Sequence, residues 1–226
     1  MDILSDFDQC LLDIGEHGGQ TWIPMSEASH QALLAAEKVH QAEGQLTGIT
    51  TGLRDLDRRL GGLHGGDLIV IAGRPGMAKT ALAVNIAFAA AKEAKKRPYI
   101  FSLEMSALDI AARIMAKDSG ISSEKQRIGP IDKHEIHLLF DSQLRIANLP
   151  IAIDDGMAVS VAQIRARARA YKRRHGLDMM IVDYLQLMHS DRRRGGENRV
   201  QEISEMTRAL KTMAVELGFR SFSSRN

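Results

Sequence analysis

The sequence Asp67-Leu-Ile-Val-Ile-Ala72, followed at once by Gly73-Arg-Pro-Gly-Met-Ala-Lys-Thr80, decides the fold of this protein. The first stretch is short, largely apolar and β-branched, and it predicts a buried strand. The second stretch contains two glycines and leads into a helical run that begins at Lys79. A strand, a glycine-containing loop and a helix that begins at Lys-Thr form the context of a Walker A loop. Because the backbone N–H groups of such a loop and the helix dipole favour negative charge, the stretch predicts a phosphate-binding site.

The Walker A pattern predicts roles for the individual residues of the loop. We expect nucleotide phosphates to be held by its eight residues, namely Gly73, Arg74, Pro75, Gly76, Met77, Ala78, Lys79 and Thr80. Lys79 would reach the outer phosphates, and the Thr80 hydroxyl would coordinate Mg²⁺. Ala78 departs from the pattern, since a glycine usually precedes the lysine. A methyl group there would crowd the nucleotide if the local φ is positive and would be harmless if φ is negative.

Strands and helices alternate along the rest of this region. Apolar runs predict further strands at residues 97–103, 149–154 and 179–183. Periodic stretches predict helices at residues 79–95, 106–116, 132–146, 161–174 and 202–217. Repeated alternation with short connections indicates an α/β fold, in which a mostly parallel sheet is covered by helices on both faces.

Two carboxylates follow predicted strands and therefore belong to the same edge of the sheet. Asp183 ends an apolar run, and we expect it to hold Mg²⁺ through the water shell of the metal. Alternatively, Asp183 caps the following turn. Glu104 follows the strand at 97–103, where it would act as a catalytic group that activates the water attacking the γ-phosphate. The residues alone leave equally open that Glu104 only supplies negative charge to the N-terminus of the next helix.

Composition limits the classes of partner. The 226 residues include 30 basic and 28 acidic side chains, so the net charge is only +2 and a nucleic-acid site must come from local clustering. The single cysteine, Cys10, excludes an internal disulfide and favours a reducing compartment. No stretch reaches the ~20 apolar residues that cross a bilayer, so we expect a cytoplasmic protein without a membrane partner.

The N-terminal region differs in composition from the rest. Ser26 can cap a helix at residues 26–41, on which one apolar face is formed by Ala32, Leu33, Ala36 and Val39. This face would pack on its own domain or on a neighbouring subunit. We divide the chain into four parts: a poorly ordered leader at 1–25, this helix and a linker at 26–45, the α/β core at 46–217 and an atypical tail at 218–226.

Six segments together resemble the bacterial replicative helicases of the DnaB type, in the order in which that family has them. They are TGITTGLRDLDRRLGGL at 47–63, GRPGMAKT at 73–80, IFSLEM at 100–105, PIAIDD at 150–155, IVDYLQLM at 181–188 and NRVQEISEMTRALKTMAVEL at 198–217. Walker loops are widespread, whereas IFSLEM together with IVDYLQLM is much more specific to this family.

The resemblance implies a RecA-like P-loop NTPase that uses ATP and Mg²⁺ in DNA replication. Such a protein forms a hexameric ring and couples ATP hydrolysis to translocation on single-stranded DNA and to duplex unwinding. The resemblance favours Glu104 as the catalytic carboxylate and Asp183 as the metal-associated acid. It also implies that the helix at 26–41 is a linker helix that packs on the adjacent subunit. Primase or a helicase loader would be partners of a full-length relative.

A basic, flexible stretch follows the strand at 179–183. It contains Arg192, Arg193 and Arg194 next to two glycines and has no aromatic residue. In a ring helicase the corresponding loop faces the central channel, so these arginines would contact DNA phosphates without base stacking. The alternative is a solvated surface loop.

The tail after Leu217 does not have the composition of the apolar strand that the family has next. Arg220, Ser221, Ser223 and Ser224 predict that no strand forms here. When residues 219–226 are back-translated and the codons are read one base earlier, permitted codons encode Val-Pro-Val-Phe-Leu-Leu-Ser-Gln. This apolar sequence suggests that a frameshift produced the tail. We therefore expect a core that is incomplete at its C-terminus and weak or inactive alone, because the missing part resembles the one that supplies an arginine finger.

Two other functions remain open from the sequence. The chain can be another RecA-like ATPase, such as a recombinase, although IVDYLQLM and the helix at 26–41 favour the helicase. It can also be a non-catalytic remnant that binds nucleotide or joins a ring through that helix.

Overall fold

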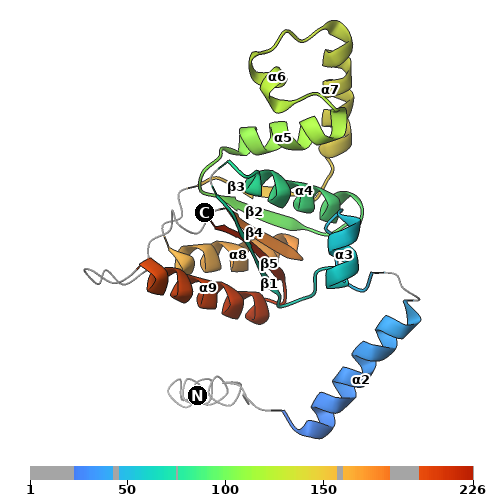
Figure 1. Ribbon diagram of the computed structural model, residues 1–226, viewed down its shortest axis with the longest axis vertical. Helices are drawn as coiled ribbons and strands as arrows, with labels where there is room; N and C mark the ends of the chain where they lie inside the picture. The colour runs from blue at the N-terminus through green and yellow to red at the C-terminus, as the bar shows by residue number, and fades with distance from the viewer. Residues whose placement is uncertain (1–22, 43–45, 75, 157–159, 184–198, 226) are drawn as a thin grey trace, which may run out of the picture. The chain divides into compact units, whose positions relative to one another are not determined.

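The computed structural model describes residues 23–42, 46–74, 76–156, 160–183 and 199–225 (Figure 1). The chain divides between Gln45 and Leu46 into two units. The smaller unit contributes one described helix, and the larger unit contains a sheet with its covering helices.

The described helix of the first unit is α2, Met25–Gln41. It begins one residue earlier than predicted: Pro24 is its N-cap, and Ser26 lies inside its first turn, where its carbonyl accepts a bond from the Ser29 hydroxyl. The prediction that Ser26 caps the helix was therefore wrong. A proline before the first turn sacrifices no hydrogen bond, because the first N–H groups of a helix have no partner within it. None of the α2 residues is buried.

The larger unit is built on one sheet of five strands, which are all parallel and have the order β1-β5-β4-β2-β3. The strands are β1 Leu68–Ala72, β2 Pro98–Ser102, β3 Ala152–Asp154, β4 Met179–Asp183 and β5 Arg220–Arg225. The predicted α/β class with a parallel sheet is thus confirmed.

The formation of β5 contradicts the prediction that residues 220–225 make no strand. The backbone of β5 pairs with β1 on one side, where Ser221 faces Leu68, and with β4 on the other, where it faces Met180. These ladders use only backbone groups, so two neighbouring strands stabilise the segment whatever its side chains are. The preceding Phe219 is fully buried and anchors the start of the strand.

Side chains of β2 and β4 alternate between the two faces of the sheet. Ile100 and Ile181 join the core beneath α4, Lys79–Lys92, and α5, Ala107–Ser119. Tyr99, Phe101, Met180 and Val182 join the core beneath α8, Val161–His175, and α9, Arg199–Glu216. Helices therefore cover both faces, as predicted (Figure 1).

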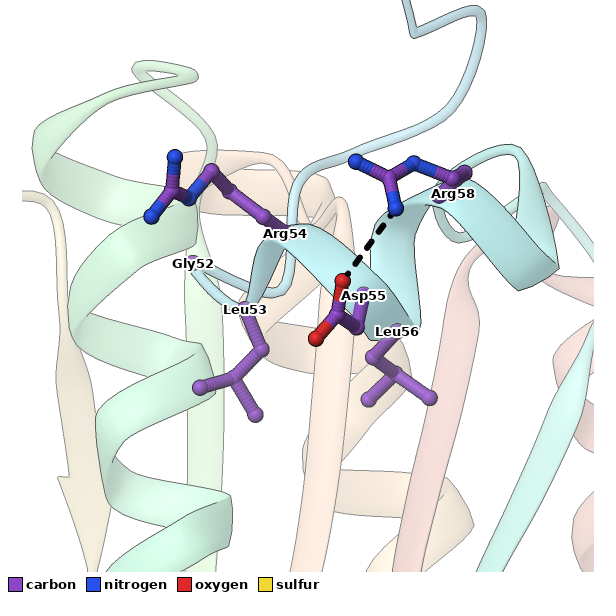
Figure 2. Close-up of a pocket in the computed structure, with 6 residues that line it drawn as sticks. All are labelled: Gly52, Leu53, Arg54, Asp55, Leu56 and Arg58. Atoms are coloured by element: carbon purple, nitrogen blue, oxygen red, sulfur yellow. Dashed lines mark hydrogen bonds and ion pairs between the residues drawn. The ribbon is translucent and has the colours of Figure 1, made fainter.

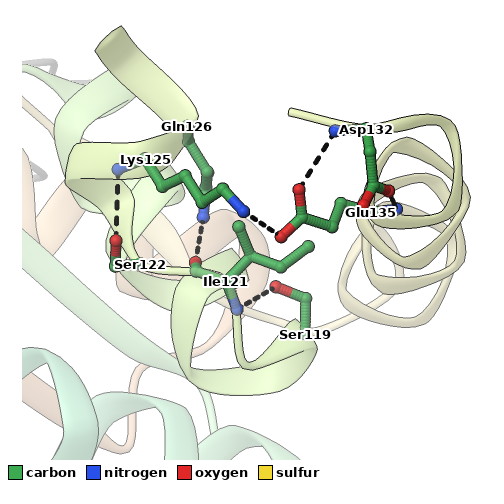
Figure 3. Close-up of polar contacts among 7 residues, drawn as sticks. All are labelled: Ser119, Ile121, Ser122, Lys125, Gln126, Asp132 and Glu135. Carbon is green, nitrogen blue, oxygen red and sulfur yellow. Dashed lines mark hydrogen bonds and ion pairs between the residues drawn. The ribbon is translucent and has the colours of Figure 1, made fainter. Parts of the chain in front are cut away.

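Two further helices extend from α5 on the α4 side of the sheet (Figure 1). They are α6, Ser123–Ile128, and α7, Lys133–Ile146. Asp132 and Glu135 form a capping box at the start of α7, and Lys125 of α6 pairs with Glu135 (Figure 3). These contacts fix α6 against the first turn of α7.

Asp118 at the end of α5 joins three helices. Its side chain is only 3% exposed and accepts bonds from Lys92 of α4 and Arg145 of α7, each at 2.7 Å. Burial alone would raise the pKa of Asp118, but the hydrogen bonds from Lys92 and Arg145 lower it below the ordinary value of 3.8. The charged form of Asp118 therefore stabilises the fold.

We expect Asp118→Asn to lower the free energy of unfolding at pH 7 by about 1–3 kcal/mol, because it weakens charge-assisted bonds to a buried acceptor. A lowered pKa gives stability that is present above pH 4 and is lost as the pH falls through the folded value. Urea unfolding at several pH values measures this. The difference in the free energy of unfolding between wild type and variant should disappear below pH 4. A difference that does not depend on pH would contradict the role of the Asp118 charge.

Candidate nucleotide-binding site

The carboxyl ends of the strands define one edge of the sheet. Because all five strands are parallel, the loops that follow β1, β2, β3 and β4 leave the sheet at this edge. Ligands of open α/β sheets bind there. The loop after β1 contains the predicted phosphate-binding residues 73–80, of which Pro75 lies outside the described residues.

Lys79 is the first residue of α4 and is only 9% exposed. Its Nζ donates to the carbonyl oxygens of Gly73 and Arg74, both at 2.9 Å. The ammonium group therefore lies across the loop that would surround a phosphate. Thr80, the next residue, is half-buried. A buried lysine that donates to two loop carbonyls is a preorganised donor for an anion.

Ala78 adopts the conformation that the sequence left undecided. Its φ is +55° and its ψ is 27°, so the residue before the lysine is left-handed and serves as the N-cap of α4. An alanine in this region costs about 1–2 kcal/mol, because its Cβ approaches the backbone. The loop is therefore strained at the position where glycine is usual.

Replacing this residue with glycine should relieve the strain. We expect Ala78→Gly to raise the free energy of unfolding by about 1 kcal/mol. The matched control is Ala81→Gly inside α4, which should lower stability by about 1 kcal/mol, because glycine disfavours a helix interior. Urea unfolding of both variants tests the pair, and a loss of stability in both would show that Ala78 is not strained.

Asp183 and Glu104 lie on neighbouring strands at the same edge. Asp183 ends β4, faces Ser102 of β2 in the register and is 3% exposed. The N–H of Leu103 donates to the carbonyl oxygen of Asp183 at 2.7 Å. Glu104 follows directly and is exposed to solvent. The structure thus brings the predicted metal acid and the predicted catalytic carboxylate to adjoining strand ends.

The segment that carries Glu104 is fixed on both sides. The Ser102 hydroxyl donates to the Met105 carbonyl at 2.7 Å and accepts from the Met105 N–H at 3.1 Å. On the other side, Asp155 accepts a bond at 2.8 Å from the N–H of Ala107, the first residue of α5. Asp155 follows β3 and is 48 residues away in sequence. It therefore links the outermost strand to the segment that holds Glu104.

The sequence did not assign Asp155 to the site. The pair Asp154-Asp155 indicated only the end of a strand and a turn, although two carboxylates at the same sheet edge as Glu104 were a signal. Asp154 has a structural role, because it accepts bonds from the Tyr99 hydroxyl at 2.8 Å and from Arg167 at 3.0 Å. Burial, together with the bond to Asp154, raises the pKa of Tyr99, so its hydroxyl stays protonated.

From the predicted role of Glu104 in ATP hydrolysis, we expect Asp155→Ala to lower kcat by roughly 5–10-fold, because it removes a charge-assisted bond that positions the segment of Glu104. The KM for ATP should stay unchanged, because the phosphate loop is not affected. Asp155→Asn keeps an acceptor and should retain most of the activity. Steady-state kinetics of both variants test this role of Asp155. A lower kcat in Asp155→Ala alone would support it, whereas a general loss of folding would lower the stability of both variants.

A hollow of about 730 Å³ lies away from these residues, at the start of α3, Arg54–Leu60 (Figure 2). Its lining includes Leu53, Arg54 and Arg58, all of which are exposed. Asp55 and Arg58 pair with each other at 3.4 Å. Thr51 and Asp57 hold α3 in place, with a hydroxyl-to-carboxylate bond of 2.6 Å. We assign no ligand to this hollow.

Comparison with known proteins places this geometry in a family. The model of the DnaB-like helicase C-terminal domain matches residues 48–220, which include the ends of β1 to β4 described above. The chain belongs to the DnaB-like helicase family. The recognition made from the sequence is thereby confirmed.

Relatives of this DnaB-like domain agree in sequence and in structure. The chain is 38% identical to the replicative DNA helicase DnaB of Leifsonia xyli over 198 residues, which is 88% of the chain and 43% of the relative. It is 40% identical to the DnaB of Geobacillus stearothermophilus over 181 residues, 80% of the chain and 40% of the relative. The chain thus spans less than half the length of these two relatives.

Two solved structures share the fold. One is an isolated ATPase domain, with a TM-score of 0.78 and 28% identity over 87% of this chain and 69% of that domain. A DnaB-like replicative helicase, described with its interactions with primase, has a TM-score of 0.76 and 28% identity, over 95% of this chain and 51% of that one. The RecA-like assignment of the fold is confirmed by these likenesses.

Further findings concern metal-ligand clusters, membrane-spanning helices and the predicted DNA-binding arginines. Arg192, Arg193 and Arg194 lie outside the described residues. In the part of the chain that the structure describes, no three His, Cys, Asp or Glu side chains gather to hold a metal ion. No helix among the same residues is long and apolar enough to cross a membrane.

Proposed function

We propose that this chain is the ATP-hydrolysing core of a replicative DNA helicase, which couples hydrolysis to translocation on single-stranded DNA. The observation that carries the proposal is the convergence of Lys79, Glu104 and Asp183 at one sheet edge within a DnaB-like domain. Its relatives are named as replicative DNA helicases, which supports DNA replication as the process and the cytoplasm as the location.

Each residue has a distinct part in this reaction. The backbone N–H groups of residues 73–80 and the start of α4 would hold the phosphates of ATP, with the Lys79 ammonium on the outer ones. Glu104 would orient the attacking water and accept its proton. The backbone of Asp183 is bonded to the end of β2 and to Leu103, directly before Glu104, so the two strand ends that carry Asp183 and Glu104 need little rearrangement when ATP binds.

The donor set at this edge fits Mg²⁺. Magnesium prefers hard oxygen ligands and keeps several waters, so it needs only one or two protein groups beside the phosphates. The Thr80 hydroxyl and the buried Asp183 carboxylate are such groups. Thr80 would bind the ion directly, and Asp183 would hold its water shell. The ion would neutralise the charge that develops on the phosphates.

Assembly into a ring is supported by two apolar surfaces. On α2, Leu33 and Val39 are 57% and 58% exposed, and they form one face of the helix together with Ala32 and Ala36. On the α5–α6 side of the larger unit, a groove of about 480 Å³ is lined by residues that include Met105, Leu108, Ala111, Ala112 and Met115. Exposed apolar surfaces of this kind mark interaction sites. We propose that α2 of one copy occupies the groove of the next, which gives the homo-oligomer, a hexameric ring.

Contact with DNA through Arg192, Arg193 and Arg194 stays a proposal that rests on the sequence. The same holds for primase or a helicase loader as a partner of the full-length protein. The solved DnaB-like helicase is described with primase, which supports this partner for a relative.

DNA-stimulated ATP hydrolysis tests the proposed function. ATP hydrolysis by the wild type, which we expect to be weak in this chain alone, should be faster in the presence of single-stranded DNA, and Lys79→Ala should not hydrolyse ATP. A specific observation favours a second candidate, a non-catalytic nucleotide-binding remnant: the strained Ala78 would impair the loop. Nucleotide binding by the wild type without hydrolysis would support that remnant and contradict the helicase.

A further inference from the structure

A cluster of basic residues lies at the amino ends of the strands, the edge of the sheet opposite the phosphate loop. Residues 95–97 (Lys-Lys-Arg) precede β2, and residues 173–175 (Arg-Arg-His) end α8 before β4. Backbone bonds join the two segments, because the Asp178 N–H donates to the Arg97 carbonyl at 3.1 Å and the Arg97 N–H donates to the Asp178 carboxylate at 3.0 Å. The side chain of Arg97 also packs against Gly176. We call these six residues the basic edge.

The two arginines of the basic edge that lie on α8 differ from the arginines earlier in that helix. Earlier arginines of α8 are paired: Arg165 and Arg169 with Glu216, and Arg167 with Asp154. Arg173 and Arg174, in contrast, are exposed and make no ion pair with any residue that the structure describes.

Lys95 holds its charge at a conformational cost. Its φ is +52°, which makes it one of two described non-glycine residues with a positive φ, beside Ala78 of the phosphate loop. Glycine is the usual residue where a helix such as α4 ends in this conformation. Strained residues cluster at functional sites, where the surrounding structure maintains them. Lys95 therefore places a strained, exposed lysine at the start of the basic edge.

We propose that the basic edge binds the phosphate backbone of DNA and is a second DNA contact, distinct from the segment after β4. The inference rests on the proposed action on DNA but not on ATP hydrolysis. No large apolar side chain is exposed at residues 93–98 or 171–178, which the structure describes throughout. A protein partner would require such anchors, whereas a polyphosphate requires only spaced cations.

The chemistry predicts binding without sequence preference. Tyr171, the nearest aromatic residue, is half-buried and stacks on Tyr99 with ring centroids 4.5 Å apart, so it is not a platform for bases. The basic edge offers charge alone, with only Glu93 and Asp178 as carboxylates nearby in the sequence. Contacts to phosphates position nucleic acid and carry no sequence information.

Fluorescence anisotropy with a labelled single-stranded oligonucleotide, without nucleotide, tests the proposal. The starting protein is the full chain with Arg192→Ala, Arg193→Ala and Arg194→Ala, which removes the other proposed contact. Adding Arg173→Ala and Arg174→Ala should weaken binding about 10-fold at low salt. It should also reduce the slope of log K against log salt by about 1.4, since each phosphate contact on a single strand contributes ~0.7.

The matched control is Arg58→Ala with Arg59→Ala on α3, which removes the same charge from exposed positions elsewhere. It should leave the salt slope unchanged. An equal loss in both pairs, or no change in slope for Arg173 and Arg174, would overturn the proposal. If the Arg173 and Arg174 changes weaken binding of a labelled poly-glutamate peptide but not of DNA, the proposal is overturned in favour of an acidic protein partner.

A single variant separates binding from folding. Lys95→Gly removes both the strain and a charge, so Tm should rise by about 2–4 °C while affinity for DNA falls several-fold. Opposite changes in stability and binding are not expected of a purely structural residue. Affinity that stays at the level of the starting protein would contradict the role of Lys95. ATP binding serves as the independent readout, because the phosphate loop lies at the other edge of the sheet.

Discussion

Glu104→Gln should lower the rate of ATP hydrolysis by about 10²–10⁴-fold while leaving the affinity for ATP unchanged. Glutamine has the same shape but cannot accept the proton of the attacking water. The segment that holds residue 104 is anchored by Ser102 and by the bond between Asp155 and Ala107, so the substitution should not change its backbone. A single-turnover assay with enzyme in excess over ATP measures the rate even when turnover is slow.

Glu93→Gln is the matched control for this experiment. Glu93 is exposed and follows the last residue of α4, far from the carboxyl ends of the strands. Its replacement should leave hydrolysis at the wild-type rate. Hydrolysis by Glu104→Gln at the wild-type rate would show that this carboxylate is only a favourable charge at the start of α5.

Lys79→Ala should weaken the binding of Mg²⁺·ATP by about 100-fold or more. Lys79 would donate charge-assisted bonds to the outer phosphates, each of which contributes about 1.5–3 kcal/mol, and 1.4 kcal/mol corresponds to a factor of ten in affinity. The lysine is buried and its Nζ already lies against the carbonyl oxygens of the loop. Titration with a fluorescent ATP analogue measures the dissociation constant.

The control for Lys79 is Lys117→Ala, which removes an exposed lysine from α5. Its affinity for the analogue should equal that of wild type. Lys79→Arg separates the charge of the side chain from its geometry. Because arginine keeps the charge but places its donors differently, this variant should have only part of the wild-type affinity for the analogue. Equal affinity of Lys79→Ala and wild type would place the nucleotide elsewhere.

Much of the site could be predicted because its signals are local. The strand at 67–72 followed by Lys79-Thr80 predicts a phosphate loop, since a simple turn does not require those two residues. Asp183 ends an apolar run, which placed it at the carboxyl edge of a parallel sheet. The segments IFSLEM and IVDYLQLM indicated the family, which the match over residues 48–220 confirmed.

Features that depend on distant parts of the chain could not be predicted. Strand β5 is polar in composition, and it forms because β1 and β4 offer backbone partners on both sides. The positive φ of Ala78 is set by how the loop meets α4, which no spacing reveals. Asp155 reaches Ala107 only because β3 lies beside β2 in the sheet.

A crystal structure with Mg²⁺ and a non-hydrolysable ATP analogue would test the central claim most directly. We predict that the triphosphate lies in the loop at 73–80, with the Lys79 Nζ on the outer phosphates. The metal should be bound by the Thr80 hydroxyl, and Asp183 should accept hydrogen bonds from its water shell. A nucleotide bound away from this loop, or a metal that touches neither Thr80 nor the water held by Asp183, would contradict the account.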